Sequence, residues 1–247
     1  MPRFFVEDLT GERACITGED ARHIGRVLRC RTGEELTLCD GRGTDARCRI
    51  LSIGPDAVEL QVEEKRPSAA EPPVFVTLYQ ALPKGDKLEL IVQKAVELGA
   101  AAVVPVLTRY CVSRPDEKAM EKKRERLQKI AREAAKQSGR GRVPEIRPLV
   151  GFPQALAEMA RDVRGIFFYE KARNPLGPAL EGFPDSLSLM VGAEGGFSEE
   201  EAQAAREAGL YPCTMGPRIL RCETAPLYAL SAVLYQYENC KRNEVVG

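Results

Sequence analysis

The sequence predicts a two-domain α/β protein, with a small strand-rich part followed by a parallel sheet covered by helices. Two patterns carry this prediction. Short strands separated by turn signals fill residues 1–66, whereas apolar strands alternate with amphipathic helices from residue 74 onward. Residues 66–73, RPSAAEPP, break both patterns with three prolines and are the expected linker. We therefore expect a β-barrel over residues 1–70 and an α/β domain over residues 74–247.

Composition limits the class of protein. The 247 residues are 44% hydrophobic and 29% charged, which are globular values. No apolar run approaches the roughly 20 residues that span a bilayer, and the start lacks a signal-peptide pattern. We expect a cytoplasmic protein that does not contact a membrane. The eight cysteines form no CxxC pair, so we expect reduced, mostly buried thiols and no metal site.

The N-terminal part reads as five short strands and one helical piece. Helical spacing over Glu19–Leu28 places His23, Ile24, Val27 and Leu28 on one face. The strands are expected over residues 3–7, 14–18, 35–40, 45–53 and 57–64. Five strands of this length predict a small barrel. Barrels of this size often bind RNA, but a fold alone does not establish that function.

The C-terminal part alternates strands with helices, which predicts a parallel sheet with right-handed crossovers. Gly99 is expected to end the first helix, Pro115 to open a long basic helix, and the final helix to carry two apolar faces. Strands are expected over residues 74–80, 101–107, 165–170 and 187–191, and helices over residues 86–98, 115–138, 153–162, 199–208 and 224–239.

The stretch Leu187–Ser198 is the expected ligand site. Its apolar run predicts a buried strand, and three glycines then allow a sharp turn and a close approach of a ligand to the main chain. Ser198 and Glu201 have the spacing of a capping box for the next helix. Open α/β sheets bind ligands at the carboxyl ends of their strands.

This turn does not match a phosphate-binding fingerprint. A Walker loop needs Lys and Ser or Thr after its last glycine, but Phe197 and Ser198 follow here. The spacing of VGAEGGF also departs from GxGxxG. Because Glu194 would repel a phosphate, a ligand with hydroxyl or amino groups fits better. A tight structural turn without a ligand is the alternative.

A second stretch, Met215–Pro226, also leads from a turn into a helix. Arg218 and Arg221 flank two apolar residues, and Thr224 has the position of an N-cap. A purely structural interpretation explains Glu223 and Thr224 through the helix dipole. It explains the two arginines less well.

Positive charge is concentrated between Arg109 and Arg147, where 13 Lys and Arg face 6 Asp and Glu. Such an excess is typical of surfaces that contact phosphate backbones. Arg140 and Arg142 lie on a glycine loop that we expect to be exposed. A solvated helix face and a charged loop without a partner remain alternatives.

Four blocks in this order, KGDKLELIVQKAVELG, KIAREAAKQSGRGRVPEI, VGAEGGFS and RILRCETAP, resemble the bacterial 16S ribosomal RNA uridine-N3 methyltransferases of the SPOUT superfamily. The resemblance covers nearly the whole chain. It implies a PUA-like barrel, a SPOUT domain with a deep trefoil knot, a homodimer and S-adenosylmethionine (SAM) as cofactor. Its expected partner is 16S rRNA or the small ribosomal subunit. Ala193 and Cys222 depart from the proline and threonine usual in the family.

The resemblance also implies roles for individual residues. Glu223 is the expected general base, or Arg221 the group that stabilises a uridine anion. Cofactor contacts are expected at Leu82, Gly192, Glu194, Gly195, Gly196, Met215, Gly216, Ile219, Leu220, Thr224 and Ala225, and RNA contacts at Arg3, His23, Arg26, Arg29, Lys84, Arg109, Arg132, Arg140 and Arg142. Alternatives are another base or a ribose 2′-hydroxyl as target, or a non-catalytic RNA-binding protein of ribosome assembly.

Overall fold

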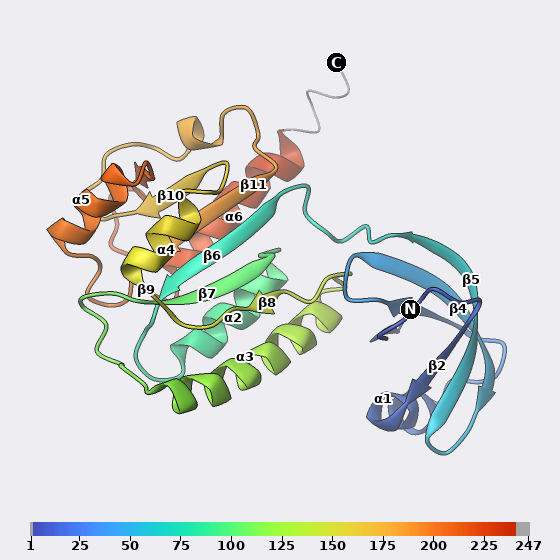
Figure 1. The fold of residues 1–247 in the computed structure, drawn as a ribbon. Coiled ribbons are helices and arrows are strands. Elements are labelled where there is room, and N and C mark those ends of the chain that lie inside the picture. The colour runs from blue at the N-terminus through green and yellow to red at the C-terminus, as the bar shows by residue number, and fades with distance from the viewer. Residues whose placement is uncertain (1, 241–247) are drawn as a thin grey trace. The chain divides into compact units, whose positions relative to one another are not determined.

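The computed structural model describes residues 2–240, which form two compact units (Figure 1). Unit 1 contains the N-terminal residues up to Glu71 together with Ala135–Val143. Unit 2 contains Pro72–Ala134 and the chain from Pro144 onward. The predicted boundaries differ in one respect, since residues 135–143 belong with the N-terminal strands. Residues 241–247 of the predicted C-terminal domain lie outside the described part.

Unit 1 is built on a five-stranded sheet. The strands in spatial order are β1 (Arg3–Phe5), β3 (Glu35–Cys39), β4 (Thr44–Ile53), β5 (Ala57–Pro67) and β2 (Arg13–Thr17). All five strands agree with the sequence-based expectation. β1 pairs with β3 in parallel and the other pairs are antiparallel, with two register shifts between β4 and β5. Phe4, Leu36, Leu38 and Ile50 lie in its buried core.

The predicted helix over Glu19–Leu28 is irregular. α1 (Gly18–Arg22) continues into a π-helical turn, η1 (His23–Val27), in which the Leu28 N–H donates to the His23 carbonyl at 2.9 Å. Because an i to i+5 turn is wider than an α-helical one, side chains three or four residues apart no longer align. Ile24 is buried, but Val27 is 66% exposed and His23 and Leu28 are also exposed. The single apolar face predicted here is therefore wrong.

Residues 135–143 are fastened to unit 1 by the carboxylate of Glu71. Its Oε1 accepts from the N–H groups of Gly141 at 2.9 Å and Arg142 at 3.0 Å. Its Oε2 pairs with Arg140 Nη2 at 2.8 Å, and the Arg140 side chain is only 3% exposed. The expectation that Arg140 is exposed is wrong, because this guanidinium is buried in an ion pair. Residues 66–73, the predicted linker, contain the boundary between the two units, between Glu71 and Pro72. The first part of this stretch is ordered, since β5 extends to Pro67 and Ser68 is buried.

Unit 2 is a seven-stranded parallel sheet, as predicted. The spatial order is β12-β10-β11-β6-β7-β8, with β9 also paired to β7. The strands are β6 (Phe75–Ala81), β7 (Ala102–Leu107), β8 (Glu145–Ile146), β9 (Val150–Gly151), β10 (Gly165–Phe168), β11 (Ser186–Val191) and β12 (Tyr211–Cys213). The two-residue β8 and β9 and the three-residue β12 were not expected, because such short strands have no recognisable period.

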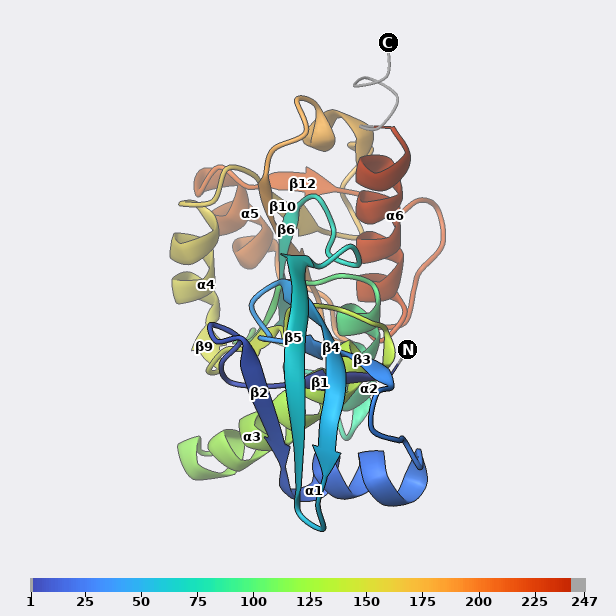
Figure 2. The ribbon, with the colours of Figure 1, turned by 90° about the vertical axis from the view of Figure 1, so that its right-hand side faces the viewer.

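Helices cover both faces of this sheet. α4 (Phe152–Met159) and α5 (Glu199–Glu207) pack on one face, and α2 (Lys87–Glu97) and α6 (Ala225–Asn239) on the other (Figure 2). α3 (Glu117–Gln137) is the long basic helix; a short 3₁₀ turn, η2, spans Gly177–Leu180. Gly99 follows α2 with a φ of 99°, as expected for a helix stop. No helix within residues 2–240 combines the length and apolar character needed to cross a membrane.

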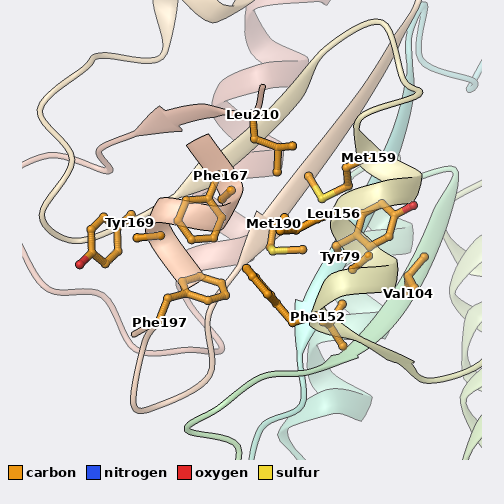
Figure 3. Close-up of a cluster of buried hydrophobic side chains, with 14 residues drawn as sticks. Tyr79, Val104, Phe152, Leu156, Met159, Phe167, Tyr169, Met190, Phe197 and Leu210 are labelled. Carbon is orange, nitrogen blue, oxygen red and sulfur yellow. The ribbon is translucent and has the colours of Figure 1, made fainter. Parts of the chain in front are cut away.

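A cluster of aromatic side chains anchors the glycine turn that follows β11 (Figure 3). The Phe197 ring lies 4.5 Å from the Phe167 ring and 6.0 Å from the Phe152 ring, measured between centroids. Phe197 is buried in the core between β10 and α4. Phe197, which directly follows the last glycine of the turn, therefore fixes the end of the turn to the sheet.

Substitution of Glu71 by alanine should destabilise unit 1. The change removes the acceptor of two backbone amides and the partner of a buried guanidinium. We expect a loss of about 3–5 kcal/mol in the free energy of unfolding, measured by urea titration of the full chain. Asp56→Ala, which removes an exposed pair with Arg22, is the control and should have a much smaller effect. Equal losses in the two variants would contradict the role of Glu71.

Candidate functional site

A cavity of about 280 Å³ lies at the carboxyl ends of three neighbouring strands, β10, β11 and β12. This volume is close to the lower end of the range of about 300–1,000 Å³ found for ligand pockets. The lining residues follow each strand in turn and are Phe168–Glu170, Val191–Phe197, Thr214–Gly216, Arg218–Leu220, Cys222 and Ala225. The cavity thus occupies the edge at which parallel sheets bind ligands.

The first wall is the turn that follows β11. The Gly196 N–H donates to the Ala193 carbonyl at 3.0 Å, and Gly196 has a φ of 64°, which favours glycine. A Cβ atom on Gly195 would lie 2.7 Å from Cβ of Tyr110. The backbone of the turn therefore needs its glycines for shape and for contact with the loop that follows β7.

A buried carboxylate, Glu201, holds this turn in place. The capping box is present: Ser198 Oγ accepts from the Glu201 N–H at 3.2 Å, and the Ser198 N–H donates to Glu201 Oε2 at 3.0 Å. Glu201 Oε1 also accepts from the Arg109 N–H at 2.8 Å. One carboxylate thus joins the start of α5 to the loop after β7.

The second wall is the irregular segment between β12 and α6. Gly216 has a φ of 90°, and within residues 2–240 the Ile219 and Leu220 amides have no hydrogen-bond acceptor. Ile219 is 85% exposed at the rim. Thr224 occupies the N-cap position, but its side chain makes no capping bond, so that part of the sequence interpretation is wrong. The N–H groups of Thr224 and Ala225 donate to the Arg221 carbonyl, each at 2.9 Å.

Lys87, at the start of α2, connects the two walls. Its Nζ lies 3.0 Å from Glu194 Oε1 and 3.2 Å from Glu223 Oε2, and donates to Cys222 Sγ at 3.6 Å. Hydrogen bonds to the two carboxylates raise the pKa of Lys87. The pKa of Glu194 is lowered, since burial, which opposes ionisation, is outweighed by hydrogen bonds from Lys87 and the backbone. The sequence analysis missed Lys87, because nothing in its local pattern indicates partners so distant in the chain.

The two residues expected to be catalytic, Arg221 and Glu223, do not line the cavity, whereas Cys222 between them does. The pKa of Glu223 is lowered by hydrogen bonds that its carboxylate accepts from the Cys222 thiol, from the backbone N–H of Glu223 and from Lys87. A lowered pKa makes Glu223 a weaker base, which counts against its predicted role as general base at neutral pH. Burial raises the pKa of Cys222 to about 12, and the hydrogen bond to the Glu223 carboxylate acts in the same direction, so this thiol is neutral.

Most residues expected to contact a cofactor lie around this one cavity. Those that line it are Gly192, Glu194, Gly195, Gly196, Met215, Gly216, Ile219, Leu220 and Ala225. Leu82 and Thr224 do not: Leu82 is buried with its N–H bound to the Val106 carbonyl, and Thr224 is exposed. The sequence analysis missed the segment Phe168–Glu170. The carboxyl-end rule would have found it, had it been applied to the strand predicted over residues 165–170.

The residues expected to contact RNA differ in accessibility. In unit 1, His23, Arg26 and Arg29 are exposed around η1. Arg3 is held by Asp45, with contacts of 2.6 and 2.8 Å to its two carboxylate oxygens, and Arg142 is half-buried. In unit 2, Lys84, Arg109 and Arg132 are exposed, and Arg109 pairs with Glu200. The group around η1 is therefore the most accessible of the expected contacts in unit 1.

Comparison with known proteins assigns the family. A family model described as the RNA methyltransferase domain matches residues 70–234, and one described as the RNA methyltransferase PUA domain matches residues 16–63. The chain is 39% identical over 251 residues to ribosomal RNA small subunit methyltransferase E of Bacillus subtilis, covering 96% of this chain and 98% of that protein. The chain belongs to the ribosomal RNA small subunit methyltransferase E family.

Solved structures agree with membership of this methyltransferase E family. The family member from Neisseria gonorrhoeae, solved with bound SAM, is 34% identical, with a TM-score of 0.85 over 96% of this chain and 97% of that one. A Legionella pneumophila protein solved with SAM as bound cofactor is 31% identical, with a TM-score of 0.80 over 94% and 96%. The resemblance inferred from the four sequence blocks is therefore confirmed.

Removal of the Glu201 carboxylate should loosen the first wall. Glu201→Ala deprives the Arg109 and Ser198 amides of their acceptor, and we expect a loss of about 3 kcal/mol in the free energy of unfolding. Glu200→Ala is the matched control, because its neighbouring carboxylate is exposed and pairs with the Arg109 side chain. Urea titration should show little change in the control. A Glu201→Ala variant as stable as the control would contradict the role of this carboxylate.

Proposed function

We propose that this protein transfers the methyl group of SAM to N3 of a specific uridine in the 16S rRNA of the small ribosomal subunit. The observation that carries this proposal is the cavity formed by two loops at the carboxyl ends of β10, β11 and β12. Family membership supports it, because the relatives are named small-subunit rRNA methyltransferases and one of them was solved with SAM.

The residues of the cavity fit SAM better than a phosphate-bearing cofactor. Glu170 and Glu194 line it, and their charge suits a cationic sulfonium, an amino group or ribose hydroxyls but repels phosphate. The amides of Ile219 and Leu220 are available as donors to a polar ring, while Phe168, Val191 and Ala225 offer apolar surface. When bound, SAM supplies a methyl group on a sulfonium that departs as a neutral thioether.

The work of the protein is then alignment and control of charge at the target base. Methylation at N3 requires the loss of the N3 proton, which places negative charge on the uracil ring. Arg218 lines the cavity, and Arg221 is exposed beside the lining residues Leu220 and Cys222. In this proposal Arg221, with Arg218, stabilises the developing anion, and the N3 proton passes to solvent.

RNA binding, assembly and location complete the proposal. His23, Arg26 and Arg29 of unit 1 and the basic helix α3 contact the phosphate backbone.

Two copies form a homodimer, supported by the exposed Tyr228 and Tyr235 on α6. The protein acts in the cytoplasm, where its rRNA substrate lies. The chain forms a trefoil knot, supported by the return of α6 from the edge strand β12 to pack on β6 and β11.

The reaction can be tested with the purified protein, SAM, and small subunits from cells that lack this gene. We expect mass spectrometry of the digested rRNA to show 3-methyluridine, formed only in the presence of SAM. Methylation of another base or of a ribose 2′-hydroxyl would replace the proposed target. The absence of any SAM-dependent methylation would favour a non-catalytic role in ribosome assembly.

Gly195→Val should abolish SAM binding while the fold survives. A side chain at this position would collide with Tyr110, displacing the first wall into the cavity. Calorimetric titration with SAM should show no binding, with an unchanged circular dichroism spectrum. Gly177→Val is the control, because the space around Gly177 is open and it lies outside the cavity. Wild-type affinity in Gly195→Val would place the cofactor elsewhere.

A further inference from the structure

Lys87 is placed to act on both walls of the pocket without lining it. Its ammonium group binds Glu194 of the first wall at 3.0 Å and Glu223 of the second wall at 3.2 Å. It also donates to Cys222 Sγ at 3.6 Å, and the Cys222 thiol donates to Glu223 Oε2 at 3.2 Å. The three partners of this one side chain therefore come from both loops that form the cavity.

The two carboxylates need a cation between them. Because both bind the same nitrogen, the oxygens of Glu194 and Glu223 lie within about 6 Å of each other. Their side chains are 30% and 20% exposed, respectively. Like charges at this separation repel each other unless a positive charge neutralises them. Lys87 supplies that charge.

Other charged groups near the start of α2 have separate partners. Lys123 of α3 donates to the Gly85 carbonyl at 3.2 Å, and Arg126 pairs with Glu89 at 2.6 Å. Lys84 contacts Glu194 only through its backbone N–H, at 3.2 Å. Within residues 2–240, Lys87 is the cation that forms ion pairs with both Glu194 and Glu223.

We propose that Lys87 is a positioning residue that joins the two walls of the cofactor pocket and thereby sets the affinity for SAM. It acts through Glu194, which lines the cavity, and through Glu223, which lies on the second wall just before the N-cap of α6. This inference rests on the proposed function, because it takes SAM as the ligand of the cavity. It also gives Glu223 a role as a partner of Lys87 in place of the base predicted from sequence.

Calorimetric titration of the full-length variants with SAM, without RNA, tests this proposal. Lys87→Met should weaken SAM binding by roughly ten-fold, because the unneutralised carboxylates of Glu194 and Glu223 then repel each other and the two walls are no longer joined. Lys94→Met is the matched control: Lys94 lies on the same helix, is 38% exposed against 37% for Lys87, and pairs with Glu97 away from the cavity. Its affinity should equal that of the wild type.

Two further variants separate positioning from general destabilisation. Lys87→Arg should retain most of the affinity, since it keeps the positive charge. Adding Glu223→Gln to Lys87→Met should restore part of the lost affinity, because it removes one of the two repelling charges. A purely structural role for Lys87 predicts no such rescue.

The outcomes distinguish the two proposals. Wild-type affinity in Lys87→Met, or a double variant no better than the single one, would overturn the role of Lys87 while leaving the proposed function intact. An absence of SAM binding by the wild-type protein would overturn both.

Discussion

The pocket depends first on one buried carboxylate, that of Glu201. It completes the capping box with Ser198 and also binds the backbone of Arg109. The glycine turn is thereby fixed at its far end, while Phe197 fixes it to the aromatic core. A turn with three glycines has high conformational entropy when free, so these anchors determine whether it keeps one shape. An open wall of main-chain groups can bind a ligand because its surroundings are rigid.

Electrostatics then determines which ligand the wall accepts. Glu170 and Glu194 line the cavity. Of the cations near them, Lys87 forms ion pairs with Glu194 and Glu223, whereas Arg218 and Arg221 lie on the second wall. This arrangement disfavours phosphate at the turn and leaves positive charge on the second wall, where Arg218 and Arg221 lie. Here the chemistry of the turn favours a cation.

Local patterns in the sequence predicted the sheet and most helices, because periodicity and capping depend on near neighbours. The pair Ser198 and Glu201 shows this, being three residues apart and present as predicted. The same reasoning missed Lys87 with Glu194, and Arg140 with Glu71, since such pairs exist only after distant segments meet. It also failed at residues 23–27, where one wider turn changes which side chains face the core.

The split composition of unit 1 has a consequence for synthesis on the ribosome. Glu71 emerges early, but the amides of Gly141 and Arg142 that it binds emerge only after residues 72–134 have been made. The N-terminal strands can pair at once, yet their unit stays incomplete until part of the second unit has left the exit tunnel. During synthesis, unit 1 can therefore be completed only after residues 135–143, which lie in the middle of the chain, have joined the N-terminal strands.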